Sequence, residues 1–303
     1  MAARRFKRLL DATVGALAVG LIGGVHWFDR RRAADFAGAA MRKVGPLFKE
    51  HRLGRENLRA AFPEKSDAEI ERILAGVWDN LGRVAVEFAH LDDFTVEGVG
   101  PGVGGPDVVT YAPATRKRFE RIIGSHRGFV GFSAHLANWE IPAVGAKLLG
   151  AKTAVLFRKP GIDAVSDLIV RLREPLMGEM IPTTLEAPLR LARLLQAGVH
   201  VGMLADQHYT KGVEVTFFNR RCLANPLIAA LARQTGAPIH GIRIVRNPDG
   251  NSFWGEVTEE IAPVRDVEGA IDIARTTQAV TTVIESWVRE HPEQWLWLHR
   301  RWR

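Results

Sequence analysis

From residue 129 onward, short apolar runs alternate with stretches of helical periodicity, and this alternation constrains the fold more than any other feature. The strand candidates are 129–133, 153–157, 199–205, 239–245 and 252–257. The helical candidates lie near 139–149, 163–176, 185–197, 225–235 and 267–290. Strands that alternate with helices fold into a sheet covered by helices. We therefore predict an α/β domain over residues 96–303, with a mixed sheet flanked by helices.

Residues 31–95 read as a helical region that packs on this domain. Ser66 and Glu69 form a capping box, and apolar residues follow at helical spacing from Ile70. The next segment, 98–106, is rich in glycine and proline and contains a G-x-G-x-x-G match. A phosphate-binding match opens a helix after a strand. Here Pro106 follows instead, so a plain loop is favoured.

The amino-terminal residues 1–30 predict a membrane anchor. The apolar stretch 12–28 spans roughly 26 Å as a helix, slightly less than a hydrocarbon core of about 30 Å. Small residues recur in it at every fourth position, which favours close helix packing. A cleaved signal peptide and a surface-lying helix are the alternatives. Basic residues flank both sides, so charge does not decide the orientation.

The positive charge of the chain is concentrated at its ends. The net charge is +7, of which residues 1–32 carry +5 and residues 291–303 carry +2, so the 258 residues between them are neutral. A nucleic-acid-binding domain needs basic residues on its binding face, so we expect no nucleic-acid partner. Cationic ends are typical of contact with anionic lipid headgroups. The single cysteine, Cys222, excludes an internal disulfide.

Polar residues follow three of the predicted strands. His135, Asn138 and Glu140 follow the first strand, Arg158 follows the second, and Asp206 and Gln207 follow the third. Ligands of open α/β sheets bind outside the carboxyl ends of the strands. We therefore expect these side chains to meet at one edge of the sheet.

His135 and Glu140 are the candidate catalytic pair. A spacing of five residues separates them by about 140° on a continuous helix. The pair therefore needs His135 in the turn after the strand and Glu140 in the first helical turn, with Asn138 as a cap. A carboxylate on one imidazole nitrogen leaves the other to act as a general base on a hydroxyl. The alternative is a histidine that bonds only to backbone.

Other chemistries fit the sequence less well. Ser133 lies in a near match to the G-x-S-x-G elbow, but His135 replaces the final glycine. The segment 145–153 resembles a P-loop with its lysine out of register. No zinc-type spacing of histidines and cysteines occurs, so we expect no metal site.

The segment His135-Leu-Ala-Asn-Trp-Glu140 resembles the H-x-x-x-x-(D/E) motif of the lipid A biosynthesis late acyltransferases, the lauroyl and myristoyl transferases. Further segments match in order along almost the whole chain. They are an amino-terminal membrane helix, 56–64, 80–83 with Glu87, 157–158, 204–207 with 217–218, and the ending 294–303. Ala137 replaces a usual glycine, and Asn219 replaces another. These departures remove no catalytic group.

The resemblance implies a glycerolipid acyltransferase-like fold and transfer of a fatty acyl chain from acyl carrier protein to a hydroxyl of a lipid A precursor. His135 would be the base, oriented by Glu140, with Arg158, Asp206, Gln207 and Asn138 binding substrate. No cofactor besides the acyl-carrier-protein co-substrate is implied. The enzyme would lie at the bacterial inner membrane, single-pass or peripheral, with its catalytic domain on the cytoplasmic face.

Several alternatives stay open at this point. The acceptor could be another glycolipid, an ornithine lipid or a lysophospholipid, and a non-catalytic membrane-tethered protein could share the fold. Arg158 and Asp206 could pair with each other as a structural salt bridge. Phe217 and Phe218 fit either the core or an acyl groove, and Trp295 and Trp297 fit either a membrane interface or a buried closing strand.

Overall fold

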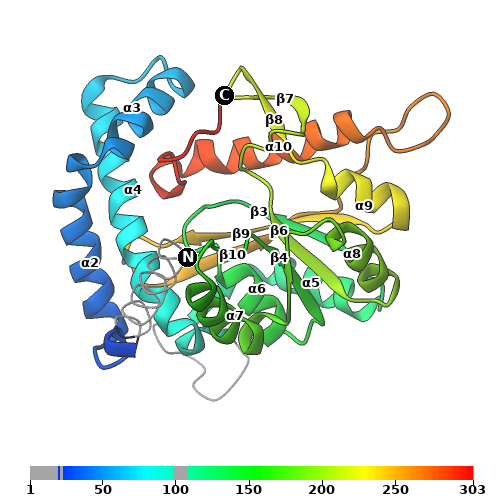
Figure 1. Cartoon of the computed structure of the whole chain (residues 1–303), viewed down its shortest axis with the longest axis horizontal. Coiled ribbons are helices and arrows are strands. Elements are labelled where there is room, and N and C mark those ends of the chain that lie inside the picture. The colour runs from blue at the N-terminus through cyan, green and yellow to red at the C-terminus, as the bar shows by residue number, and fades with distance from the viewer. Residues whose placement is uncertain (1–19, 21–22, 98–107, 303) are drawn as a thin grey trace, which may run out of the picture.

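The computed structural model describes residue 20 and residues 23–97 and 108–302, and its centre is an eight-stranded mixed sheet (Figure 1). The strands lie in the order β1-β2-β10-β9-β3-β6-β4-β5. Only the β9–β10 pair is antiparallel within this sheet. The strands are β1 (Thr95–Val96), β2 (Val108–Tyr111), β3 (Val130–Ser133), β4 (Thr153–Phe157), β5 (Glu179–Pro182), β6 (His200–Leu204), β9 (Ile239–Arg246) and β10 (Phe253–Val257). A separate hairpin pairs β7 (Val213–Phe217) with β8 (Arg220–Ala224).

Helices cover both faces of the sheet, as expected for an α/β fold. One face packs against α5 (Pro113–Gly124), α6 (Ile141–Leu148) and α7 (Asp163–Met177), and the other against α8 (Ala187–Gln196), α9 (Leu227–Thr235) and α10 (Ile273–Glu290). Figure 1 shows the two helical layers on either side of the strands. The prediction of a mixed sheet flanked by helices is confirmed.

The predicted strands and helices agree closely with the structure. Each of the five predicted strands is present, displaced by no more than one residue at either end. All eight residues of β9 are buried, including His240, Arg243 and Arg246, because helices cover both faces of the sheet at this strand. The strands β1, β2, β5, β7 and β8 were not predicted.

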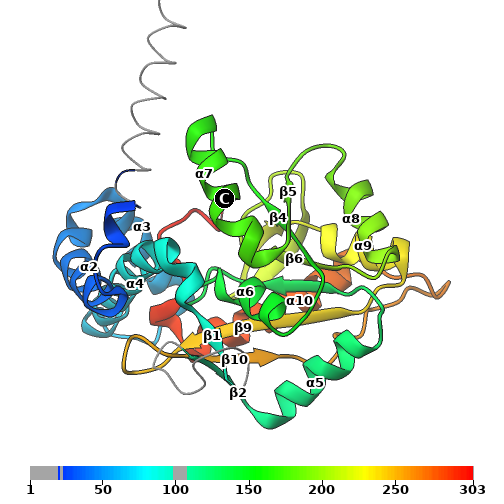
Figure 2. The ribbon, with the colours of Figure 1, turned by 90° about the horizontal axis from the view of Figure 1, so that it is seen from below.

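The predicted helical region contains α2 (Arg30–Val44), α3 (Lys49–Ala61) and α4 (Asp67–Glu87), with short 3-10 turns η1 (Gly45–Leu47) and η2 (Phe88–Asp93). The capping box forms as expected, because Ser66 and Glu69 bond each other's backbone amide. Figure 2 shows these helices grouped at one end of the sheet. The apolar face of α4 joins the main core through Ile70, Leu74 and Val77.

Most of the predicted membrane anchor lies outside the described residues. In the part of the chain that the structure does describe, no helix is long and apolar enough to cross a bilayer. The predicted loop at 98–106 also falls outside this part of the chain.

The segment after α10 is buried in the core. It begins with a 3-10 turn, η3 (Pro292–Gln294). Trp295 and Trp297 are completely buried and pack with Phe217 and Phe218, so all four side chains belong to the core. Arg301 is also buried and donates to the Leu223 carbonyl oxygen. Of the two interpretations left open for Trp295 and Trp297, burial within the protein is therefore the one that the structure supports.

Candidate active site

His135 lies in the loop after β3, and its ring bonds to Asp206 in the loop after β6. His135 Nδ1 is 2.8 Å from Asp206 Oδ1, and the His135 backbone amide donates to Asp206 Oδ2 over 2.8 Å. Strands β3 and β6 are adjacent and parallel, with Ser133 opposite Leu204. Their carboxyl ends therefore deliver these residues to the same point of the sheet edge.

The charge state of Asp206 fixes the imidazole tautomer. Burial alone would raise the pKa of this carboxyl, but the charge and hydrogen bonds of His135 outweigh it and hold the pKa well below its usual range. An ionised carboxylate only accepts hydrogen bonds, so Nδ1 carries the proton. In the neutral ring Nε2 is then an acceptor, and the Gln207 amide nitrogen lies 3.3 Å from it. His135 therefore has the arrangement that a general base needs.

Glu140 does not take the position expected for it. Its side chain bonds to Arg173 of α7, and no hydrogen bond joins it to His135 among the described residues. The residue lies at the start of α6, as the spacing argument required. However, the loop conformation brings Asp206, and not Glu140, to the imidazole. The expected His135–Glu140 hydrogen bond is thus corrected to a His135–Asp206 bond.

Ala137, in the middle of this loop, has a left-handed backbone with φ of +47°. Non-glycine residues rarely adopt this conformation, because Cβ approaches the backbone. This geometry explains why glycine fits this position of the motif. Ala137 is completely buried, and its carbonyl oxygen accepts a hydrogen bond of 3.0 Å from Asn80 on α4. A hydrogen bond from the helical region therefore fixes the backbone of this loop.

Asn138 supports the loop from inside the protein. It is completely buried, donates to Glu87 over 2.9 Å and accepts from the Glu140 amide over 3.1 Å. We predicted a substrate-binding role for Asn138, and its burial leaves no surface for substrate contact. Asn138 therefore positions the loop. The prediction that it caps the helix was wrong, because the N-cap residue of α6 is Glu140 and no side chain caps this helix; the bond from the Glu140 amide to Asn138 closes a turn just before it.

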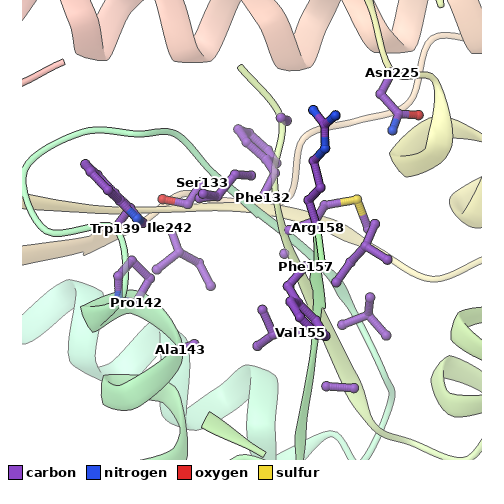
Figure 3. Close-up of a pocket in the computed structure, with 18 of the residues that line it drawn as sticks. Phe132, Ser133, Trp139, Pro142, Ala143, Val155, Phe157, Arg158, Asn225 and Ile242 are labelled. Carbon is purple, nitrogen blue, oxygen red and sulfur yellow. The ribbon is translucent and has the colours of Figure 1, made fainter. Parts of the chain in front are cut away.

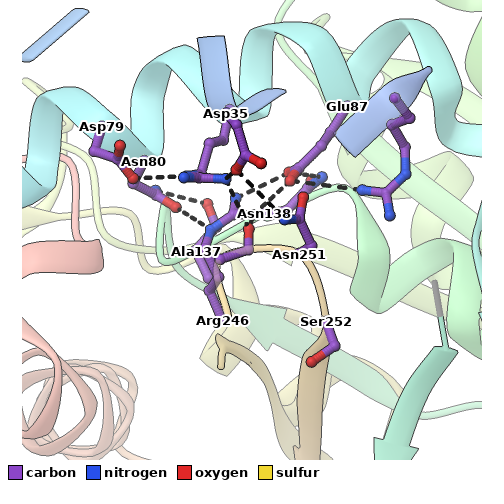
Figure 4. Close-up of polar contacts among 12 residues, drawn as sticks. Asp35, Asp79, Asn80, Glu87, Ala137, Asn138, Arg246, Asn251 and Ser252 are labelled. Atoms are coloured by element: carbon purple, nitrogen blue, oxygen red, sulfur yellow. Dashed lines mark hydrogen bonds and ion pairs between the residues drawn. The ribbon is translucent and has the colours of Figure 1, made fainter. Parts of the chain in front are cut away.

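Glu87 and Arg246 form a buried ion pair behind Asn138 (Figure 4). Both guanidinium Nη atoms contact the carboxylate, and Arg246 Nε donates to Asn80 Oδ1 over 2.9 Å. The Glu87 side chain has no exposed surface. A charge buried this deeply requires a partner. The pair thus connects α4 and β9 to the loop that carries His135.

The segment around Trp295 closes the loop from the other side. Leu136 and Trp295 form an isolated antiparallel bridge, and the Leu296 amide donates to the His135 carbonyl oxygen over 3.1 Å. The Trp295 indole donates to Asp206 Oδ2 over 2.7 Å. Asp206 therefore accepts three hydrogen bonds, two from His135 and one from Trp295.

A cavity of about 820 Å³ extends from His135 along the α6 face of the sheet. Figure 3 shows Pro142 and Ala143 facing Val155 and Phe157 across it. The other apolar lining residues include Phe129, Ala146, Met177 and Ile242. Cavities that bind small molecules are mostly apolar with a few placed polar groups. The lining also includes charged side chains, Glu140, Arg158, Arg173 and Lys211, so the cavity combines an apolar wall with charged groups.

The remaining predicted site residues also line this cavity. Arg158 is exposed at the end of β4, and Gln207 is exposed beside the imidazole. Asp206 is already bonded to His135 and Trp295, so the structural Arg158–Asp206 salt bridge is not formed. Sequence reasoning missed Arg173, whose side chain is 18% exposed at the cavity wall. The only signal in the sequence was a basic residue within the predicted helix 163–176, and the sequence alone does not show that this residue faces the cavity.

The chain matches the model of one protein family over residues 5–303, and this family is described as bacterial lipid A biosynthesis acyltransferase. No individually curated protein matches the chain. The match covers the helical region, the loop of His135 and the segment around Trp295. The chain therefore belongs to the bacterial lipid A biosynthesis acyltransferase family.

Proposed function

We propose that this protein transfers a fatty acyl chain from an acyl-carrier-protein thioester to a hydroxyl of a lipid A precursor. His135 acts as the general base and Asp206 orients it. The observation that supports this proposal is the 2.8 Å bond between His135 Nδ1 and Asp206, made beside a large cavity lined by both apolar and charged side chains. The family match supports the lipid A pathway. The reaction needs no cofactor besides the acyl donor.

The proposed reaction is one direct transfer. The acceptor hydroxyl displaces Gln207 from His135 Nε2 and gives this nitrogen its proton as its oxygen attacks the thioester carbonyl carbon. The tetrahedral intermediate then collapses, the carbon–sulfur bond breaks, and the imidazolium returns the proton to the leaving thiolate. Asp206 stabilises the imidazolium through its ionised carboxylate. The products are an ester and a free thiol, and no acyl-enzyme forms.

The charged residues around the cavity have separate roles in this proposal. Arg158, exposed at the carboxyl end of β4, binds a phosphate of the donor or acceptor or stabilises the oxyanion. Glu140 and Arg173 neutralise each other in the cavity wall. Glu140 thus holds Arg173 in place. The role of orienting His135, which was predicted for Glu140 from the sequence, belongs to Asp206 in this proposal.

The acceptor is an amphiphile, so the enzyme must work at a membrane surface. We propose association with the cytoplasmic face of the inner membrane, through the amino-terminal region. Aromatic and aliphatic side chains are exposed on and beside α2, with Phe36 76% and Leu47 82% exposed. Lys43 and Lys49 lie in the same region of the chain. Apolar and basic side chains together are typical of contact with anionic bilayers.

The test is mass spectrometry of lipid A precursors incubated with the purified enzyme and acyl carrier proteins. We expect one added acyl chain with the native enzyme, and a loss of about 10²–10⁴-fold in rate with His135→Gln. His126→Gln, at an exposed turn, is the control and should leave transfer unchanged. If the lipid A precursor stays unmodified while an ornithine lipid, a lysophospholipid or another glycolipid is acylated, the proposed acceptor is wrong and that lipid is the acceptor. No product with any acceptor would favour a non-catalytic protein.

A further inference from the structure

Two glycines form the floor of the cavity in the middle of the sheet. Gly131 of β3 and Gly202 of β6 are direct partners in the parallel ladder, and Val155 of β4 is the next partner of Gly202. Partners in register point to the same face of a sheet. Both glycines line the cavity beneath α6, whose Ala143 and Ala146 form the opposite wall. The space between sheet and helix is thus left open by small residues on both sides.

The two glycines differ in what a side chain would meet. A Cβ on Gly131 would lie 3.0 Å from Phe129 Cε2, so existing protein atoms already limit this position. A Cβ on Gly202 would meet no heavy atom within 4 Å. Because interiors are normally close-packed, a half-buried strand position with no neighbour leaves space that a ligand can occupy. A side chain at Gly202 would enter the cavity itself.

The far end of the cavity lies at the start of the same strands. His200 begins β6, is 4% exposed, and packs on Phe129 at a ring distance of 4.5 Å. From His200 to Ala205, beside the reactive end, the strand rises about 17 Å. Gly202 lies between these two ends, at the point where a straight chain would cross β6.

We propose that Gly202 determines how long an acyl chain the enzyme accepts. This inference rests on the proposed function. The thioester carbonyl lies at His135, and the saturated chain extends along the strands over Gly202 toward Phe129 and His200. The apolar lining of this path favours a hydrocarbon ligand. A larger residue at position 202 blocks the path halfway and leaves room for shorter chains only.

The test compares Gly202→Val with Gly124→Val. Gly124 ends α5 on the surface, and a Cβ there also meets no heavy atom within 4 Å. Transfer is measured with decanoyl, lauroyl, myristoyl and palmitoyl carrier proteins. We expect Gly202→Val to lower the rate ratio of the longest to the shortest accepted chain at least tenfold, and Gly124→Val to keep the native ratio. An unchanged ratio in a folded Gly202→Val protein would reject the inference.

Two further measurements keep the inference separate from the proposed function. If Gly202→Val does not fold, Gly202→Ala must show a smaller shift in the same direction, and an unchanged ratio rejects the inference. Independently of transfer, free fatty acids of increasing length should raise the Tm of the native protein. This gain should stop at a shorter chain in the Gly202 variant. Native protein that transfers no acyl chain but keeps this length-dependent Tm gain would reject the proposed function alone.

Discussion

The indole of Trp295 donates a 2.7 Å hydrogen bond to Asp206, the carboxylate that orients His135, across 89 residues of sequence. Both Trp295 and Asp206 are buried, at 0% and 1% exposure. Asp206 Oδ2 accepts this bond and a second one from the His135 backbone amide, while Oδ1 accepts from the imidazole. The position of the carboxylate bonded to His135 therefore depends on a residue that is distant in sequence.

Trp295→Phe should lower kcat by about 10–100-fold with little change in KM, because outer hydrogen bonds orient reacting groups without touching substrate. The matched control is Trp302→Phe, which removes an indole donor to the Phe217 carbonyl oxygen in the same aromatic cluster. Steady-state kinetics on both variants checks the prediction. Equal losses of kcat in the two would show that the cluster matters only for folding.

Asp206→Asn should lower kcat by about 10²–10⁴-fold, because the amide no longer fixes the Nδ1–H tautomer or stabilises the imidazolium. Glu140→Gln should cost less than Asp206→Asn and leave the acid limb of the pH–rate profile in place, because Glu140 bonds to Arg173. Kinetics over a pH range compares the two. A larger loss in Glu140→Gln, with a shifted acid limb, would return the orienting role to Glu140.

Acid should destabilise the native protein partly through Asp206. Its pKa is lowered on folding, so its contribution to the free energy of unfolding is complete above the ordinary aspartate pKa of about 3.9 and is lost as the pH falls below it. Urea unfolding between about pH 5 and 3 should therefore show a shallower loss for Asp206→Asn than for the native chain. Parallel curves would contradict this assignment.

His200 predicts a second pH effect in a different range. Burial, with a smaller contribution from His240, lowers its pKa to about 4. The unfolded chain takes up this proton near pH 6.5, so the free energy of unfolding should fall between about pH 6.5 and 4, and no further below that. At pH 5, His200→Gln should remove about 2 kcal/mol of this loss. Chemical denaturation of both proteins at pH 7 and pH 5 measures the difference.

Glu87→Ala should lower the free energy of unfolding by about 3–5 kcal/mol, because it leaves Arg246 buried without its charge partner. The control, Glu71→Ala, breaks an ion pair with Arg55 that is partly exposed, and should cost less than about 1 kcal/mol. Replacing both Glu87 and Arg246 by apolar residues should recover part of the stability. It should not recover transfer, since Asn138 and the His135 loop lose their support.

The sequence predicted the central strands and most helices because their signals are local. Strands β3, β4, β6 and β9 are mostly apolar and contain buried residues, and Ser66 with Glu69 marks the start of α4 without help from distant residues. The unpredicted β1 is only two residues long, and β5 has only two apolar residues, between Glu179 and Pro182, so neither forms an apolar run. The hairpin of β7 and β8 has a tight turn in which Phe218 and Asn219 have positive φ. Such turns are usually recognised by a glycine, and this one contains none.

The site was predicted in its location but not in its pairing. His135, Arg158 and Asp206 each follow an apolar run in the sequence. Because these runs form neighbouring parallel strands, the three residues lie at the same edge of the sheet. Which carboxylate reaches the imidazole depends on the loop, through the left-handed Ala137 and the buried Asn138. Those residues are held by contacts from α4 and the Trp295 segment. Both lie far from the loop in the sequence, so no local sequence pattern could predict these contacts.

The antiparallel bridge between Leu136 and Trp295 has a consequence for biosynthesis. A nascent chain synthesised only as far as residue 290 already contains every strand of the sheet, all the cavity-lining residues and both members of the His135–Asp206 pair. It still lacks the backbone partner of the loop and the indole donor to the carboxylate. The loop of His135 should thus reach its final conformation only after the Trp295 segment has left the ribosome and docked against the sheet, later than the sheet itself can form.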